Sequence, residues 1–229
     1  MTKKSGIDQD ALIEMFSQAS ARQGEALRKA VSTATLKALQ GRELTLQNVR
    51  NVLQAVTQAA SAGAAQNPGS TADVQKLLEK AFDGMDGALL KAVEAHRTAL
   101  QQFISQGADL QQGPLKTALA NLEKMEEVFF STVGKAIQDS AGPVQNAWAP
   151  VLNAMKLKGT DTGAQATATV EQLLDQAHST LRDSRAMGLR TAQALLEGYS
   201  TLVSGVLIGM TEGLQQGSAE APATGTRKR

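Results

Sequence analysis

Side chains that carry out chemistry in enzymes are scarce in this sequence. The chain of 229 residues has two histidines, His96 and His178, and no cysteine. Asp175 and His178 stand three residues apart, the helical spacing that di-iron bundles use for a carboxylate and an imidazole, but such a site needs a second pair and two further glutamates. His96 has Val93 at the matching position. We therefore predict no metal ion and no cofactor, and we expect both histidines to be partly exposed on helices.

No other motif supplies a reaction centre. The sequence has no glycine-rich phosphate loop and no nucleophile elbow. Without cysteine, disulfides, thiolate metal ligands and cysteine nucleophiles are excluded as well. The sequence thus predicts a protein that has no catalytic residues and is not an enzyme.

Composition favours helices over sheets. Alanine (37 residues) and glutamine (22 residues) make up a large share of the chain, whereas aromatic residues are 3% of it. Alanine and glutamine are good helix formers, and strands depend on aromatic and β-branched side chains. With 42% hydrophobic residues, the chain is able to bury a sizeable core. The predicted fold class is all-α.

Charge is distributed unevenly along the chain. Five of the 23 cations, Lys3, Lys4 and residues 227–229, lie at the ends, so residues 5–226 carry 18 cations and 22 acids. Nucleic-acid binding needs a basic face, and we therefore expect no specific nucleic-acid partner. The basic C-terminal end is either a frayed, solubilising terminus or a weak contact for DNA or an anionic surface. No secretory signal is visible, so the expected location is the cytoplasm.

Apolar residues recur at helical spacing in long segments that are separated by glycine and proline. They predict one helix from residue 7 to Gly41, a second from Thr45, a linker over 63–70, a third helix over 71–106, and a fourth from Pro114 to residue 142. A short helical piece over 144–155, which Pro150 would kink or split, a linker over 158–163 and a last long helix complete the pattern. The long helices are expected to form a bundle or an extended coiled-coil-like array. Because strict heptads are not sustained, bundle packing is favoured over a long two-stranded coil.

This pattern divides the chain into four parts. They are an N-terminal helical pair (1–62), a central helical region (71–157), a C-terminal long helix (164–216) and a disordered basic tail (217–229). Together they are expected to form one helical domain.

The clearest apolar face belongs to the third helix. Ser70 and Asp73 resemble a capping box that starts it. Its face consists of Leu77, Leu78, Phe82, Met85, Leu89, Val93, Leu100 and Phe103. Such a face is either the core of a bundle or a surface that opens onto lipid or polymer.

Glycines recur every four residues near the C-terminus. Gly205, Gly209 and Gly213 share one stripe, and each weakens the helix by about 1 kcal/mol relative to alanine. They indicate either close contact with another helix, as in small-xxx-small packing, or a helix that frays. The uncharged stretch 198–211 is shorter than the roughly 20 residues of a membrane span, so we predict no transmembrane segment.

One segment resembles a known family. The run Lys80-Ala81-Phe82-Asp83-Gly84-Met85, followed by Asp86 and the leucines and valine up to residue 104, is similar to the opening of the long amphipathic helix of phasins. Phasins are helical, associate with themselves and coat polyhydroxyalkanoate granules. The resemblance covers about 30 residues and implies a similar non-catalytic role and a location at a granule surface.

Two functional hypotheses follow. The first is a phasin-like protein that forms homo-oligomers and coats polyhydroxyalkanoate granules or another hydrophobic surface through its amphipathic helices. The alternative is a structural or regulatory helical bundle that binds a protein partner or a membrane surface.

Overall fold

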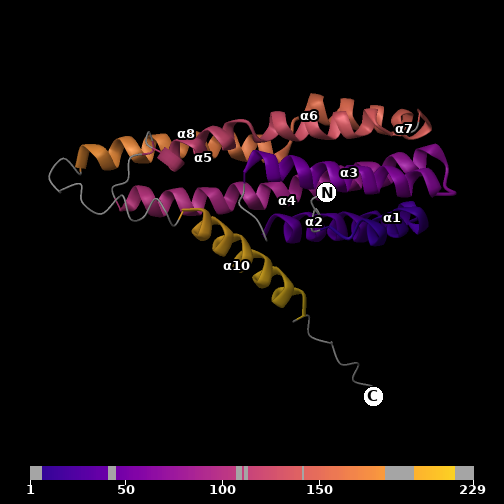
Figure 1. The fold of residues 1–229 in the computed structure, drawn as a ribbon, viewed down its shortest axis with the longest axis horizontal. Coiled ribbons are helices and arrows are strands. Elements are labelled where there is room, and N and C mark those ends of the chain that lie inside the picture. The colour runs from indigo at the N-terminus through magenta and orange to yellow at the C-terminus, as the bar shows by residue number, and fades with distance from the viewer. Residues whose placement is uncertain are drawn as a thin grey trace, which may run out of the picture.

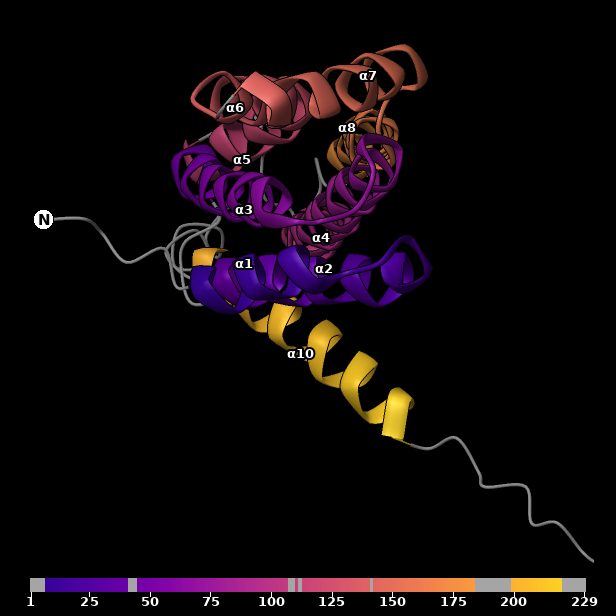
Figure 2. The ribbon, with the colours of Figure 1, turned by 90° about the vertical axis from the view of Figure 1, so that its right-hand side faces the viewer.

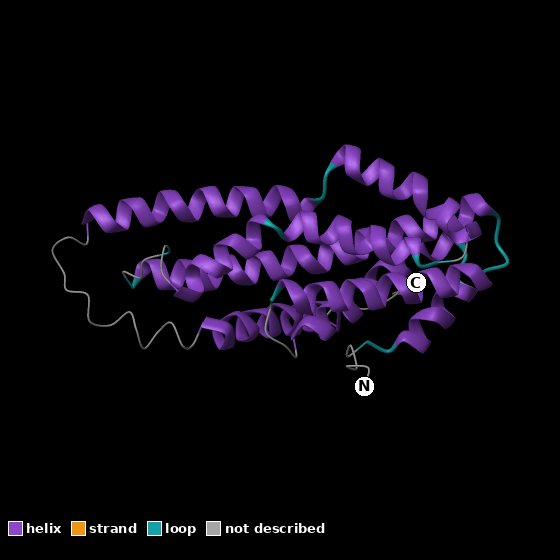
Figure 3. Cartoon of the chain, turned by 45° about the horizontal axis from the view of Figure 1, so that its top comes forward, coloured by secondary structure: helices purple, strands orange, loops and turns teal. Residues whose placement is uncertain are grey.

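The computed structural model describes residues 7–40, 45–106, 110, 113–140, 142–183 and 199–219. Within these ranges every regular element is a helix (Figure 3), so the predicted all-α class is confirmed. The predicted tail lies outside the described residues from 220 onward, and so does part of the predicted last helix, 184–198.

The helices are arranged in layers (Figure 1). The elements in chain order are α1 (Gln9–Gln18), a 3-10 turn (Ala21–Gln23), α2 (Gly24–Gln40), α3 (Leu46–Gln66), α4 (Thr71–Ser105), α5 (Gly113–Glu123), α6 (Met125–Gln138), α7 (Gly142–Lys158), α8 (Asp161–Asp183) and α10 (Tyr199–Ala219). Helices α1 and α2 form one outer layer, α3 and α4 the middle layer, and α5 to α8 the other outer layer, while α10 diverges from the bundle (Figure 2).

Helix α4 is the central element. It has 35 residues and is therefore about 52 Å long. Ser70 caps it, since its side chain accepts a hydrogen bond from the backbone N–H of Asp73, as the sequence predicts. It packs against α2, α3, α5, α7, α8 and α10. The predicted uninterrupted helix over 71–106 is confirmed.

The core is one cluster of apolar side chains that extends from Leu12 in α1 to Leu207 in α10. The ring centroids of Phe82 and Phe129 lie 4.6 Å apart and link α4 to α6. The single tryptophan, Trp148, is fully buried, and its indole N–H donates to the hydroxyl of Ser61 at 3.0 Å.

Two glycines allow helices to approach closely. A Cβ on Gly84 would lie 2.6 Å from the carbonyl oxygen of Arg28 and 2.9 Å from Cβ of Val31. A Cβ on Gly63 would collide with Phe16 in α1. Glycine is therefore required where α4 meets α2 and where α3 meets α1.

The prediction of one helix from residue 7 to Gly41 is wrong. The chain leaves helical conformation at Ala19, and Ser20 begins a new turn with a capping box to Gln23. The side-chain amide of Asn67 donates to the carbonyl oxygens of Phe16 and Ala19. These bonds satisfy carbonyl groups that the end of a helix leaves without partners.

Four further boundaries differ from the prediction. The linker over 158–163 is reduced to Gly159 and Thr160, because α8 begins at Asp161. The linker over 63–70 is shorter, because α3 continues to Gln66. The fourth predicted helix is divided at Lys124 into α5 and α6. Pro150 does not split α7, which runs from Gly142 to Lys158; one face of this helix, with Trp148 on it, is buried in the core.

The predicted single helix over 164–216 is also wrong. Residues Asp161 and Tyr199 would lie about 57 Å apart in a continuous helix. In the structure Asp161 bonds to Asp86 and Tyr199 bonds to His96, which lie about 15 Å apart along α4. The described parts therefore form two helices that return to the same central helix, and α10 includes residues 217–219, which the sequence assigns to the tail.

Candidate functional site

All eight residues of the predicted apolar face lie in the core. The exposed fractions are 0% for Leu78, Met85, Leu89, Val93 and Leu100, 1% for Phe82, 2% for Leu77 and 3% for Phe103. In this structure the face is therefore part of the closed core of the bundle and is not an open surface. A hydrophobic surface reaches these side chains only if a covering helix moves.

Helix α8 covers the C-terminal half of α4, along which it runs (Figure 1). Residues seven positions apart lie on nearly the same face of a helix. Asp86, Val93 and Leu100 are therefore on one stripe of α4, which we call the Asp86 stripe. The first turn of α8 lies at Asp86, the N-terminal end of this stripe.

A buried carboxylate holds the first turn of α8. Asp86 accepts the backbone N–H of Asp161 on Oδ2 at 2.9 Å and that of Thr162 on Oδ1 at 3.1 Å. The hydroxyl of Thr162 donates to the carbonyl oxygen of Asp86 at 2.9 Å. A carboxylate at this position satisfies orphan N–H groups and interacts favourably with the helix dipole.

A second carboxylate comes from α6. Oε1 of Glu126 accepts both the backbone N–H of Thr160 at 3.0 Å and its hydroxyl at 2.8 Å. The hydroxyl of Thr160 in turn accepts the N–H of Gly163 at 2.9 Å. A Cβ on Gly163 would collide with the Glu126 carboxylate. We call Asp86 and Glu126 together the α8 clamp.

Burial raises the pKa of Asp86 above its ordinary value, while its hydrogen bonds to Thr162 and Asp161 oppose the shift. The carboxyl lines a cavity of about 430 Å³ between α2, α4 and the α7–α8 connection. Part of the wall is formed by an ion-pair network, in which Nζ of Lys80 lies 3.0 Å from Glu25 and 3.5 Å from Asp83. The cavity therefore belongs to the surroundings of the clamp.

Helix α10 is anchored by a histidine. Nδ1 of His96 lies 2.7 Å from the hydroxyl of Tyr199, and the ring centroids of Phe103 and Tyr199 are 5.6 Å apart. His96 is 2% exposed, so the expectation that both histidines are partly exposed is wrong for His96, whereas His178 is exposed. Desolvation raises the pKa of Tyr199 well above its ordinary value.

The glycine stripe of α10 points away from the bundle. Val203, Leu207 and Thr211 are buried, whereas Gly205 and Gly209 lie on the opposite side. No heavy atom lies within 4 Å of a Cβ built on Gly205 or Gly209. The predicted close contact is therefore not made inside the described part of the chain.

Two neighbours complete this outer face. Ile208 is 41% exposed. Gly213 lies in α10, but its surroundings fall outside the described residues.

Among the described residues no group of three or more His, Asp or Glu side chains is placed to hold a metal ion. In the same residues no helix is long and apolar enough to cross a membrane.

Comparison with known protein families identifies the family to which the chain belongs. A family of unknown function (DUF6781) matches residues 2–216, which include every described helix except the end of α10. The chain belongs to this family. No curated protein and no solved structure matches the DUF6781 chain significantly. The family membership thus carries no activity with it.

The sequence pattern does not predict the clamp. Asp86 stands out only as the last acid of the phasin-like run, and no motif marks Glu126. One signal was present, because Asp86 shares a seven-residue spacing with Val93 and Leu100, which places an acid on an otherwise apolar stripe. Its partners come from positions about 75 residues further on, and a sequence pattern does not reveal such pairs.

Proposed function

We propose that this DUF6781 protein is a non-catalytic, phasin-like protein that self-associates and coats hydrophobic polymer granules. The observation that supports it best is the outward position of Gly205 and Gly209 on α10. A helix with a small-residue stripe is suited to close contact with the same stripe of a second copy. The phasin-like run of α4 supports the polymer surface as the target.

The energetics of α10 favour a partner on its outer face. Each glycine in an exposed helix interior costs about 1 kcal/mol relative to alanine, and no described group inside the bundle approaches Gly205 or Gly209. Close helix packing against a second copy would offset this cost. The 14 residues from 198 to 211 carry no charge, so two such faces would meet without burying an unpaired charge.

A substitution on the stripe tests self-association. Replacing Gly205 and Gly209 with leucine should lower the molecular mass that light scattering measures, because leucines prevent close approach. The matched control places the same two leucines at Gln172 and Ser179, exposed positions of α8. An unchanged mass in the glycine variant would argue against self-association through α10.

The coating activity is tested separately. Purified wild-type protein should co-sediment with polyhydroxybutyrate particles and stay bound in high salt, because the contact is apolar. Protein that remains in the supernatant at every salt concentration would overturn the granule proposal. A glutamate at Leu77 or Phe82 is not a suitable variant, since both side chains are buried and a charge there would unfold the bundle.

A second candidate function is a helical module that binds a membrane surface. It is favoured by one observation, the exposed Ile208 on the uncharged outer face of α10. Binding to vesicles that contain anionic lipid, and its loss in Ile208→Glu, would support this function over granule coating. Wild-type protein that does not bind such vesicles at low salt would remove it.

A further inference from the structure

We propose that α8 is a hinged cover: the α8 clamp holds it closed, and its release opens the Asp86 stripe of α4 to a hydrophobic surface. This inference rests on the proposed function, because it explains how a buried face reaches a granule. It assigns a regulatory role to residues for which the sequence indicated none.

The stripe under α8 is apolar and fully covered. Val93 and Leu100 have no exposed surface, and they lie one and two heptads after Asp86 on the same side of α4. Because α8 packs on α4 from Asp86 onward, we expect its movement to expose both side chains.

The clamp concentrates the polar attachment of α8 at its first turn. Asp86 and Glu126 together accept the N–H groups of residues 160–162, and the hydroxyl groups of Thr160 and Thr162 add two more bonds. Hydrogen bonds to charged groups are stronger than neutral ones and are costly to break one at a time. Release of both carboxylates would leave the first N–H groups of α8 without protein partners.

The apolar attachment of α8 is weaker than that of α2. Over residues 161–180, where the side chains of α8 are described, the buried ones that belong to the core are Ala166, Val170, Leu173 and Ala177, of which two are alanine. Those of α2 include Leu27, Val31, Leu36 and Leu39. In addition, α2 approaches α4 closely at Gly84. Since burial energy rises with apolar area, we expect this part of α8 to separate from α4 at a lower cost than α2.

The connection before α8 allows it to swing. Only Gly159 and Thr160 separate α7 from α8. Gly159 has a φ of +78°, which side-chain-bearing residues rarely adopt. A change of backbone angles at these two residues would turn α8 without moving α7, and loss of the Glu126 bonds to Thr160 frees this connection.

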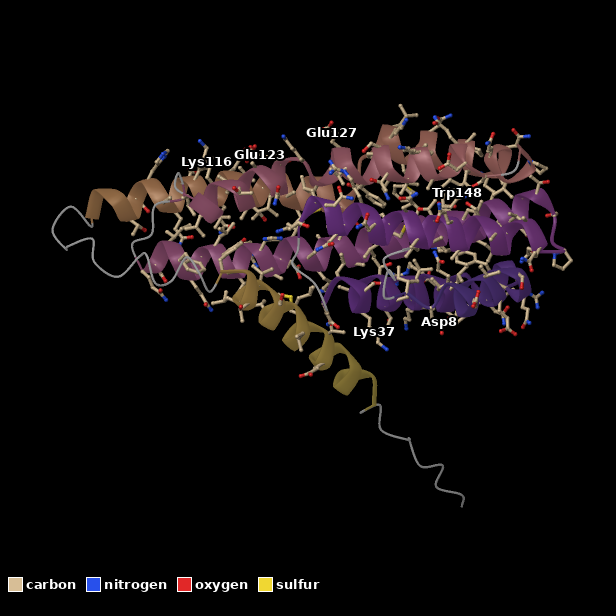
Figure 4. The ribbon with its side chains drawn as sticks, viewed as in Figure 1. Asp8, Lys37, Lys116, Glu123, Glu127 and Trp148 are labelled. Atoms are coloured by element: carbon tan, nitrogen blue, oxygen red, sulfur yellow. The ribbon has the colours of Figure 1, made fainter. Side chains whose placement is uncertain are left out.

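Thiol labelling measures the opening directly, because the chain has no cysteine. Leu100→Cys places one probe on the Asp86 stripe, and Val31→Cys places another between α2 and α4. The clamp is weakened by Glu126→Gln together with Thr162→Val, both of which keep the side-chain volume. The matched control is Glu127→Gln, an exposed neighbour on the outer side of α6 (Figure 4).

A maleimide should label the Leu100→Cys protein at least about 10-fold faster when the clamp substitutions are present than when they are absent. This factor corresponds to the loss of one hydrogen bond to a charged group. Labelling at Val31→Cys, and labelling in the Glu127→Gln control, should not change. No acceleration at Leu100→Cys overturns the cover. Equal acceleration at both probes also overturns it, because it shows that the whole bundle opens.

Binding to polyhydroxybutyrate particles separates this inference from the proposed function. If the clamp variant labels faster and also binds the particles more tightly than wild type, both are supported. If it labels faster but neither protein binds, the cover stands and the granule function is wrong. If both proteins bind equally and labelling is unchanged, the function stands and the cover is wrong.

Discussion

The hydroxyl of Tyr199 lies 2.7 Å from Nδ1 of His96, and both side chains are buried. This contact joins two residues that are 103 positions apart and fixes the start of α10 on α4. Because burial raises the pKa of Tyr199, the hydroxyl keeps its proton at neutral pH. It is therefore able to donate a hydrogen bond to the imidazole of His96. The anchor is therefore a specific polar contact within an apolar interface.

Tyr199→Phe should loosen α10. The substitution removes the hydroxyl but keeps the ring that packs on Phe103. Loss of one partner of a buried hydrogen bond costs about 1–3 kcal/mol, and we expect amide hydrogen exchange in residues 199–211 to become faster by a corresponding factor. Exchange in α3 should not change. Ile208→Val, which shortens an exposed side chain of the same helix, is the control, and equal exchange in the two variants would contradict the anchoring role.

The buried carboxyl of Asp86 predicts a defined pH dependence of stability. Burial raises the pKa of Asp86 in the folded protein above its unfolded value. The folded state therefore binds a proton more tightly than the unfolded state, and stability that is present at low pH is lost as pH rises through the folded pKa. The contribution of this one carboxyl to stability should therefore fall as pH rises above the ordinary aspartate pKa of about 4.

Asp86→Asn isolates this contribution, because asparagine does not titrate in this range. The difference in the free energy of unfolding between variant and wild type, measured by urea denaturation at several pH values, should shift in favour of the variant as pH rises. Asp175→Asn, which changes an exposed carboxyl on α8, should show no such trend. A pH-independent difference for Asp86→Asn would mean that the hydrogen bonds to α8 cancel the effect of burial.

Two glycines of α4, three positions apart, should respond in opposite ways to alanine. At Gly84 a Cβ would lie 2.6 Å from a backbone oxygen of α2, whereas at Gly87 the nearest atom is Oγ of Ser32 at 3.9 Å. Gly84→Ala must push α2 away and should destabilise the protein by about 1–3 kcal/mol. Gly87→Ala should stabilise it by up to about 1 kcal/mol. Thermal unfolding followed by circular dichroism measures both, and equal effects would contradict the close approach of α2.

Local signals in the sequence predicted the fold class and several helix boundaries. Ser70 and Thr45 each cap a helix with their side chain, as expected. Helices α5 and α7 begin at Gly113 and Gly142, the glycines that precede proline. These signals act over three or four residues. For that reason they are visible without knowledge of the fold.

The wrong predictions concern helix boundaries and side-chain burial that depend on contacts between residues far apart in the sequence. Gly63 indicated a linker, but it lies inside α3 because α1 packs against it. The predicted apolar stripe includes Ala19, but α1 ends at Gln18, where the amide of Asn67 binds the carbonyl oxygens of Phe16 and Ala19. His96 suggested an exposed side chain, since its partner Tyr199 was unknown. The clamp was missed for the same reason.

The single tryptophan permits a test of one buried hydrogen bond in the core. Trp148 lies between α7 and α3 (Figure 4), and its N–H donates to the hydroxyl of Ser61 at 3.0 Å. Ser61→Ala leaves this donor buried without a partner and should cost about 1–3 kcal/mol. Trp148→Phe removes the donor and some packing, so the double variant should be more stable than the sum of the two single losses predicts. Urea unfolding of the four proteins, followed by circular dichroism, gives the coupling energy, and strict additivity would show that the bond contributes nothing to stability.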